Sequence, residues 1–410
     1  MTYENRFNAT TQLRLSPFFE RTSQLNESQE WRRWAGHLAA TSYELTHENE
    51  YFAIRTKAGL LDITPLKKYI VEGQDAQKAL DNIVTRNIEI CKVGQVMYTT
   101  WCDEDGKVID DGTVQRLSKN KFRITSAEPN LEWIETNTAG MDVQIKDDSY
   151  STAALALQGP NSRQILNTVS SKNLDSLRFF WMMDTHFGDI PVSISRTGYT
   201  GDLGYEIWMD PENALAVWDL LIDKGAPFGI TPTGLHALDI ARVEAGLILL
   251  DVDYISSRHA IIDDRKSSPY ELGLGWTVKM KKNNFIGKNA LVEEEQNGAS
   301  WNFVGIEIEW PEFEKHYRKV GLPPGLPSTA WRTSTPLYNK QNQQVGYATS
   351  GTWSPILKRY IALAHIKSKY AKEGSELMFE LKVEHFRKLT KATVVKTPFF
   401  DPERKRSCPV

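Results

Sequence analysis

The spacing of apolar and polar residues in the first third of the chain predicts a small antiparallel sheet with helices. A strand at 69–72 and a helix beginning near Asp75 precede three strands, which are joined by polar turns at 103–106 and 118–121. Polar turns between β-rich runs are typical of an antiparallel meander. A second helix is expected at 130–139.

The middle of the chain continues this mixture of strands and helices. It contains a predicted strand at 153–157, a helix at 161–169 and two strands within 191–209 around a glycine-rich bend. Thr231 and Pro232 offer an N-cap and a proline at the first helical position, so we expect a helix to begin there. The predicted fold class is therefore α+β.

The last quarter of the chain has a different character. The segment 292–331 is rich in Glu, Pro and Trp, and the prolines within 323–327 mark a linker or surface excursion, after which strands dominate. We therefore expect two regions. The first, 1–299, contains two α+β lobes, one of them formed by 65–140, and the second, 300–410, is a β-rich C-terminal domain.

The composition is that of an ordinary globular protein. The 410 residues are 40% hydrophobic and 25% charged, and 49 Lys and Arg against 52 Asp and Glu give a net charge of -3. This balance does not favour nucleic acid, which attracts broad positive surfaces. The three cysteines include no Cys-x-x-Cys pair, so a reducing compartment is expected.

Two features bear on location. The longest apolar run, 245–250, is far shorter than the ~20 residues that cross a bilayer. The segment from Met1 to Arg21 has no cationic stretch leading into an apolar one, as a secretory signal has. The sequence therefore predicts a soluble, cytoplasmic protein without a membrane span.

Candidate chemistry lies on the predicted meander. If its two turns are symmetric, Tyr98 lies across from Asp111 and Ser126 lies across from Thr113, so all four side chains share one face of the sheet. Asp110 then points the other way. On the pattern alone, two solvated carboxylates beside a tight turn explain the Asp-Asp pair equally well.

Several motifs, spread from residue 16 to residue 399, occur together in this chain. They are 108–112 (Val-Ile-Asp-Asp-Gly), 156–160 (Ala-Leu-Gln-Gly-Pro), 195–206 (Ser-Arg-Thr-Gly-Tyr-Thr-Gly-Asp-Leu-Gly-Tyr-Glu), 242–246 (Arg-Val-Glu-Ala-Gly), 273–276 (Gly-Leu-Gly-Trp), 285–288 (Phe-Ile-Gly-Lys) and 349–355 (Thr-Ser-Gly-Thr-Trp-Ser-Pro). In kind and order they resemble the glycine-cleavage T-protein (aminomethyltransferase) family. The resemblance implies a three-lobed cloverleaf of antiparallel sheets and helices, with a C-terminal β-barrel domain and a central channel for tetrahydrofolate.

The resemblance also implies roles for individual residues. Asp111 matches the catalytic aspartate of the family, and the residues that match or occupy cofactor-binding positions are Tyr98, Ser126, Tyr199, Glu206 and Trp276. A pterin is flat and edged with donors and acceptors, so an aromatic wall and a fixed carboxylate suit it. Packing explains a lone Trp276 equally well, and a glycine-rich hairpin with a buried tyrosine is the alternative for 195–206.

The chain departs from the T-protein pattern around the implied channel. Leu238 replaces an arginine, Gln115 replaces a tyrosine, and 249–253 reads Leu-Leu-Asp-Val-Asp where the family has Leu-Tyr-Gly-Gln-Asp. These changes suggest a different donor. We therefore expect a tetrahydrofolate-dependent methyltransferase, or demethylase, that moves a one-carbon unit from a small methylated donor to N5 of tetrahydrofolate.

Four further residues have open roles. Trp101 and Tyr254 are candidates to bind an onium donor by cation–π attraction, although packing explains both. His236 and Asp251 lie near the departures and are candidate donor contacts, although a structural role suits a histidine on a helix flank better.

Two other functions compete with the demethylase reading. The first is a glycine-cleavage aminomethyltransferase that acts on the aminomethyl-lipoyl arm of a carrier protein. The second is a non-catalytic folate-binding assembly factor, but the Lys-Gly-Cys and Gly-Gln-Glu motifs of those relatives are absent. No residue set has metal-ligand spacing and no loop has a nucleotide fingerprint, so tetrahydrofolate is the only cofactor implied.

Overall fold

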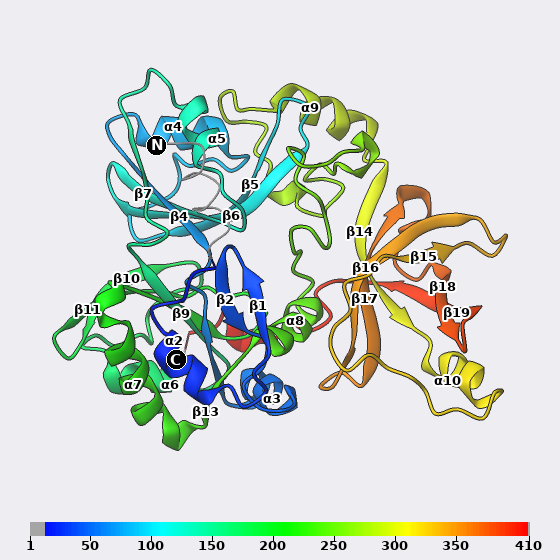
Figure 1. The fold of residues 1–410 in the computed structure, drawn as a ribbon. Coiled ribbons are helices and arrows are strands. Elements are labelled where there is room, and N and C mark those ends of the chain that lie inside the picture. Colours follow the sequence, from blue (N-terminus) through cyan, green and yellow to red (C-terminus); the bar gives the residue numbers. More distant parts are fainter. Residues whose placement is uncertain (1–12, 409–410) are drawn as a thin grey trace.

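The computed structural model describes residues 13–408. The predicted absence of a secretory signal concerns the segment from Met1 to Arg21, and the first twelve residues of that segment lie outside the described part. Figure 1 shows two α+β lobes one above the other and a separate β-barrel beside them. The predicted α+β cloverleaf with a C-terminal barrel is confirmed. Within the described part, no helix is both long and apolar enough to span a bilayer.

The first lobe is built on a five-stranded sheet in the order β5-β6-β7-β4-β8. Its elements are β4 (Lys67–Glu72), α4 (Ala76–Ile83), β5 (Val96–Cys102), β6 (Val108–Ser118), β7 (Lys121–Ser126), α5 (Leu131–Asn137) and β8 (Gln144–Asp147). One face of the sheet packs apolar side chains such as Phe122 and Ile124 against Leu80 and Ile134 of the two helices. The opposite face carries the polar residues that form the site.

The register of this sheet differs from the symmetric one expected from its turns. A bulge between Trp101 and Cys102 pairs Tyr98 with Thr113 instead of Asp111. This is a shift of two residues, so Tyr98 and Asp111 still share a face.

The second turn shifts the register by one residue, and the predicted place of Ser126 is wrong. An irregularity between Arg116 and Ser118 pairs Ser126 with Gly112. A one-residue shift moves a side chain to the other face. The Ser126 hydroxyl therefore lies away from Asp111 and donates to the Glu128 carbonyl at 2.7 Å, while Thr125 takes the expected position.

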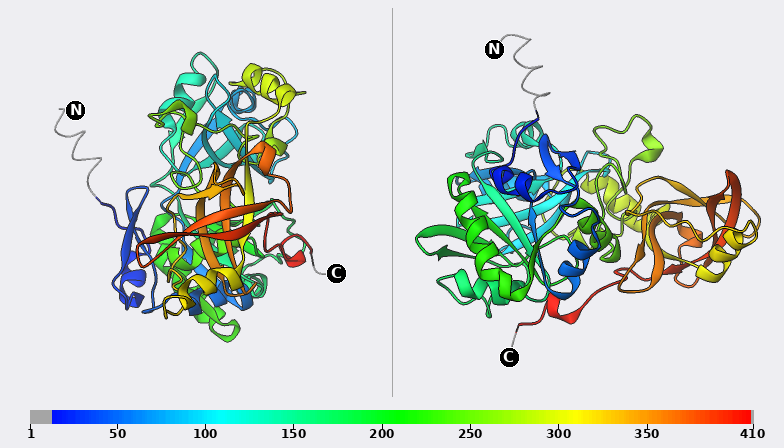
Figure 2. Two further views of the ribbon diagram at one scale, coloured as in Figure 1. Left: turned by 90° about the vertical axis from the view of Figure 1, so that its right-hand side faces the viewer. Right: turned by 60° about the horizontal axis from the view of Figure 1, so that its bottom comes forward.

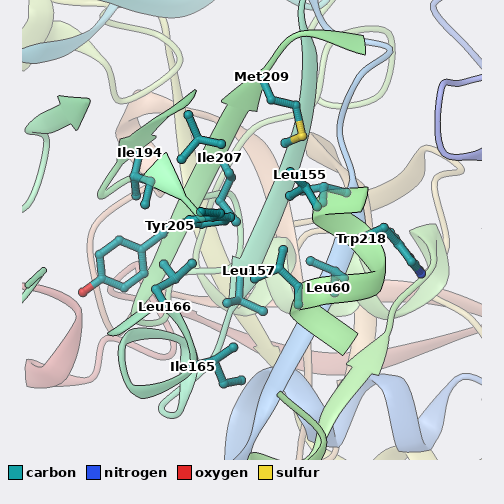
Figure 3. Packing of buried hydrophobic residues seen from close by; sticks show 14 of the residues in the cluster. Leu60, Leu155, Leu157, Ile165, Leu166, Ile194, Tyr205, Ile207, Met209 and Trp218 are labelled. Atoms are coloured by element: carbon teal, nitrogen blue, oxygen red, sulfur yellow. The ribbon is translucent and has the colours of Figure 1, made fainter. Parts of the chain in front are cut away.

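The second lobe contains a six-stranded sheet in the order β10-β11-β12-β9-β3-β13. Its elements are β3 (Ala58–Asp62), β9 (Ala153–Gln158), α6 (Ser162–Val169), β10 (Met182–Phe187), β11 (Ile190–Ser195), β12 (Gly204–Met209), α7 (Ala214–Gly225) and β13 (Ile230–Pro232). Figure 3 shows Leu155, Leu157 and Ile207 packed near Trp218 in its core. Each such side chain contributes about 1.5–3 kcal/mol when fully buried.

The predicted helix start at Thr231 and Pro232 is wrong. Both residues belong to β13, which pairs in parallel with β3. The helix α8 (Leu235–Glu244) begins three residues later. The backbone N–H of Gly234 donates to the Glu50 carboxylate at 2.7 Å, which satisfies a donor just before the helix.

The N-terminal elements and the connection to the barrel complete the larger region. They are α2 (Phe19–Leu25), β1 (Trp31–Trp34), β2 (His37–Ala40), α3 (Glu48–Thr56), the short helix η4 (Gly275–Thr277) and α9 (Lys288–Asn297). Helix α8 lies between the second lobe and the barrel (Figure 1). Its buried Glu244 accepts hydrogen bonds from Arg55 at 2.6 Å and from Ser354 of the barrel at 2.5 Å.

The barrel closes in the order β14-β17-β16-β15-β18-β19. Its elements are β14 (Trp301–Ile308), α10 (Trp310–Arg318), β15 (Thr335–Tyr338), β16 (Gln344–Ser354), β17 (Arg359–Lys367), β18 (Glu376–Val383) and β19 (Phe386–Val395). The prolines at 323–327 lie in a stretch, 319–330, that has neither helix nor strand, in line with the predicted excursion. The barrel strands do not all follow it, because 292–331 also contains the first barrel strand and α10, whose Phe313 packs into the barrel core.

After the barrel the chain returns to the second lobe (Figure 2). The buried Arg196 guanidinium donates to the carbonyls of Arg404 and Lys405, both at 3.1 Å, and of Ser407 at 2.6 Å. Arg404 in turn forms two hydrogen bonds with Asp202, at 2.7 and 2.8 Å. These contacts lie just before the loop 197–203, which carries Tyr199, and at Asp202 within it.

Candidate functional site

The site is centred on Asp111, which lies half-buried on the polar face of the first-lobe sheet. The Tyr98 hydroxyl donates to its Oδ2 at 2.8 Å, and the Tyr254 hydroxyl donates to its Oδ1 at 2.6 Å. Each carboxylate oxygen thus has a phenolic donor. No Lys or Arg forms an ion pair with Asp111 within residues 13–408.

The neighbouring residues explain why Asp111 alone faces the site. Asp110 points to the other side of the strand, where it accepts hydrogen bonds from Asn130 Nδ2 at 2.9 Å and from the Glu128 N–H at 3.0 Å. Gly112 allows the strands to come close, because a Cβ there would lie 1.9 Å from the Thr125 carbonyl oxygen. Asp110 is therefore structural.

Burial controls the protonation of this cluster. Burial raises the pKa of Asp111, and the hydrogen bonds from Tyr254 and Tyr98 oppose that rise. Burial and the neighbouring Asp111 charge also raise the pKa of Asp110. Burial and the same charge hold the pKa of both tyrosines well above the usual 10.0, so they remain hydrogen-bond donors.

An aromatic surface adjoins Asp111. Trp276 of η4 stacks on Tyr98 with ring centroids 6.0 Å apart and planes inclined by 23°. The Arg86 guanidinium lies 5.2 Å from the Trp276 ring centroid. Since Trp276 is 53% exposed, it is available to a flat ligand.

The loop between β11 and β12 brings Tyr199 to the same region. Gly198 and Gly204 make room for Gln158, because a Cβ at either position would lie about 2 Å from the Gln158 amide oxygen. Gln158 accepts from the Thr200 hydroxyl at 2.9 Å and so fixes the loop. The Tyr199 hydroxyl donates to the Ile248 carbonyl. Burial raises the pKa of Tyr199, and the Asp111 charge contributes to the rise.

Glu206 is the candidate carboxylate of the second lobe. Its Oε2 accepts from Thr197 at 2.6 Å and from Ser195 at 3.4 Å, and burial raises its pKa. Within the described residues, Oε1 has no hydrogen bond. Glu206 shares a strand face with Trp208, over which Arg123 of the first lobe lies at 5.2 Å. This face of the second lobe therefore looks toward the first lobe.

The remaining sequence candidates have structural surroundings. Trp101 is 1% exposed, and its indole N–H donates to Asn130 at 3.3 Å, so it belongs to the core. His236 lies 3.6 Å from Glu30 on the flank of α8. Asp251 is exposed and has a φ of 63°.

Pattern reasoning did not identify Tyr254 as a partner of Asp111. It lies in an irregular segment 143 residues along the chain, and no local periodicity connects the two. The only available signal was its position directly after the departures at 249–253.

Comparisons with known proteins agree with this architecture. The GCVT N-terminal domain family model matches residues 15–282, and the glycine cleavage T-protein C-terminal barrel domain model matches residues 318–401. The solved structure of glycine cleavage system aminomethyltransferase T from Bartonella henselae superimposes with a TM-score of 0.80 at 24% identity, covering 95% of this chain and 98% of that one. The fold is therefore that of a T-protein.

Sequence relatives extend the match along nearly the whole chain. A Halothermothrix orenii protein named Aminomethyltransferase is 35% identical over 392 residues, which are 94% of this chain and 100% of the relative. A Bacillus mycoides protein of the same name is 34% identical over 359 residues, covering 86% and 89% of the two chains. This chain belongs to the glycine-cleavage T-protein family and is a tetrahydrofolate-dependent one-carbon transferase.

The expected demethylation of a small methylated donor is wrong. The relatives carry the name aminomethyltransferase and match 87–96% of this chain. The departures at 249–253 suggested a different donor, but the structure gives them backbone and packing roles. Asp251 replaces a family glycine at a left-handed φ, a conformation that aspartate tolerates.

Proposed function

We propose that this protein is an aminomethyltransferase, which takes the one-carbon unit from an aminomethyl-lipoyl carrier protein and passes it to tetrahydrofolate. The observation that carries the proposal is Asp111, held by two tyrosine hydroxyls on a face lined by Trp276, in a chain whose full-length relatives bear this name. This activity requires a lipoyl-bearing carrier protein as a partner.

The site residues fit a reduced pterin. Among the residues that the structure describes, one carboxylate oxygen of Glu206 has no hydrogen-bond partner, which suits the N–H edge of such a ring. Tyr199 and the exposed face of Trp276 would form aromatic contacts, and Tyr98 supports Trp276 from behind. Bound tetrahydrofolate would supply the nitrogen that accepts the carbon unit.

Asp111 would act by electrostatics. Its carboxylate, oriented by Tyr98 and Tyr254, favours positive charge that develops on the substrates and can hold a proton during transfer. Because no guanidinium or ammonium group pairs with it among residues 13–408, this charge is available to the substrates. The burial that raises its pKa also strengthens the interaction.

The test is a reconstituted half-reaction. An aminomethylated lipoyl carrier and tetrahydrofolate are added to the protein, and ammonia and methylene-tetrahydrofolate are measured. We expect stoichiometric formation of both, dependent on both substrates. Ammonia release at the rate of an enzyme-free control would reject the proposal.

We further propose that 1–299 and 300–410 are separate domains and that the protein is cytoplasmic. The barrel strands, which begin at Trp301, form a hydrophobic core of their own. The thiols of Cys91, Cys102 and Cys408 are all free, which suits a reducing compartment. Limited proteolysis near residue 300 and cell fractionation test these two points.

A further inference from the structure

Tyr254 is the least expected member of the Asp111 cluster, because it reaches the aspartate from outside the first lobe. We propose that Tyr254 is a positioning residue, which fixes the Asp111 carboxylate in its ionised form and links it to the barrel. The proposal rests on the proposed function in one respect, namely that Asp111 acts there as a carboxylate.

The geometry gives Tyr254 and Tyr98 different tasks. Tyr98 lies on β5 beside Asp111 and bonds Oδ2, whereas Tyr254 bonds Oδ1 from a separate segment. Two donors on opposite oxygens fix both the position and the rotation of the carboxylate plane. Tyr254 is 3% exposed, so water does not compete for its hydrogen bond.

The hydroxyl of Tyr254 has a clear preference between the two aspartates. It lies 2.6 Å from Asp111 Oδ1 but 3.5 Å from Asp110 Oδ1. A phenol has one proton to donate, and the shorter contact receives it. Asp110 has its own backbone and amide donors, so the bond to Asp111 is the one that Tyr254 completes.

A tight turn holds Tyr254 in this place. Leu250 forms an isolated bridge with Tyr254, and the Asp251 N–H donates to the Tyr254 carbonyl at 2.8 Å. The left-handed φ of Asp251 makes the turn possible. Leu250 and Tyr254 also pack with Cys102 and Val108 of the first lobe.

The residue before Tyr254 connects the turn to the barrel. The buried Asp253 carboxylate pairs with Arg242 of α8 and accepts from the hydroxyls of Thr349 and Ser350 of β16, the latter at 2.7 Å. Its carbonyl contacts His365 Nε2 of β17 at 2.5 Å. The barrel therefore helps to fix the donor that reaches Asp111.

The competing explanation is that Tyr254 only fills the core and that its hydroxyl does not affect the Asp111 carboxylate. The two explanations differ in what happens to the Asp111 carboxylate when the hydroxyl is removed. A positioning role changes its protonation, whereas a packing role changes only stability.

The experiment measures that protonation without relying on activity. The protein is labelled with carboxyl-¹³C aspartate, the Asp111 signal is assigned with Asp111→Asn, and its titration is followed by NMR in wild type and Tyr254→Phe. Loss of a charge-assisted hydrogen bond should raise the pKa of Asp111 by about one unit. The acid limb of kcat/KM in the carrier assay should move up by the same amount, with an alkaline plateau within about threefold of wild type.

Two further variants of the protein serve as controls in this experiment. Tyr360→Phe removes a phenol that accepts from Trp331 Nε1 at 2.9 Å in the barrel, and it should leave the Asp111 titration unchanged. A fluorinated tyrosine at position 254 keeps the ring and strengthens the donor, so it should lower the pKa of Asp111. It also preserves the test if Tyr254→Phe does not fold.

The outcomes separate the two proposals. An Asp111 titration that is unchanged in both position-254 proteins, with any rate loss equal at every pH, would overturn the positioning role while wild-type turnover stands. A shifted titration in a wild type that does not turn over the carrier substrate would instead reject the proposed function and leave the positioning role in place.

Discussion

The carboxylates of Asp111 and Asp253 lie at the two ends of a short connection through Tyr254, and their surroundings are opposite. Asp253 is ion-paired with Arg242 and accepts from hydroxyls of the barrel. Among residues 13–408, Asp111 accepts side-chain hydrogen bonds only from two neutral phenols, and burial raises its pKa. The first carboxylate has its charge compensated within the protein and holds parts of the structure together. The second has an uncompensated charge, which costs stability and is available to a substrate.

The largest effect should come from breaking the compensated cluster. Arg242→Met leaves the buried carboxylates of Asp239 and Asp253 without a shared cation, and removing one partner of such a buried pair costs about 3–5 kcal/mol. Urea denaturation should show this loss of unfolding free energy. Arg21→Met, which breaks an exposed pair with Asp219, is the control and should change little. Equal losses of unfolding free energy in Arg242→Met and Arg21→Met would show that the buried ion pairs stabilise the protein no more than the exposed one.

The next effect should come from Asp111→Asn. We expect kcat in the carrier assay to fall about 10²–10³-fold, the amount that follows loss of one preorganised electrostatic group. Asn keeps the shape of the side chain, and its single amide oxygen can accept from one of the two tyrosines. Asp189→Asn, on an exposed turn, should retain wild-type kcat. A kcat within about threefold of wild type would remove Asp111 from the mechanism.

The same variant should be more stable than wild type at neutral pH. Because the folded-state pKa of Asp111 lies above the ordinary 3.8, the unfolding free energy of wild type falls as the pH rises from 3.8 through the folded-state pKa. Asn has no such penalty, so the advantage of the variant should grow over this range. Thermal melts from acid to neutral pH check the sign. A variant less stable than wild type at neutral pH would contradict it.

A smaller effect is expected at Glu206. Glu206→Gln keeps the hydrogen bonds from Thr197 and Ser195 but removes the negative charge, so KM for tetrahydrofolate should rise about tenfold with a smaller change in kcat. Initial rates at varied tetrahydrofolate measure both constants. If KM for the carrier rises instead, Glu206 belongs to the carrier side of the site.

The smallest effect should come from Tyr205, whose buried hydroxyl has no hydrogen-bond partner in the described part of the chain. Tyr205→Phe removes an unsatisfied polar atom and should leave the unfolding free energy unchanged or slightly higher. Tyr51→Phe is the contrasting variant, because it removes a donor to the buried Glu244 and should cost about 1–2 kcal/mol. Urea denaturation of both variants is the measurement.

Much of the fold could be predicted because its signals are local. The strand at 153–157, the helix at 161–169 and the meander up to residue 127 follow from apolar spacing and turn residues, and the structure has all of them. The register could not be predicted, because symmetric turns were assumed and the bulges beside Cys102 and Ser118 displace the pairing. One of them moved Ser126 to the opposite face.

The site residues that belong to recognisable motifs could be predicted, and the others could not. Tyr98 and Asp111 share a face as expected, since alternation along a strand survives a shift of two residues. Tyr254 reaches Asp111 through a turn that depends on α8 and the barrel, and a local pattern contains neither. The departures at 249–253 were misread as changes of substrate because the left-handed φ of Asp251 is visible only in three dimensions.

The hydrogen bonds from Arg196 to the segment that follows the barrel have a consequence for biosynthesis. The carbonyl of Ser407 lies 211 residues beyond Arg196 in the chain, so the ribosome must finish the barrel before the guanidinium finds its acceptors. Until then, the loop bearing Tyr199 lacks one of its supports. A nascent chain should therefore complete the support of this loop only after the barrel has been synthesised.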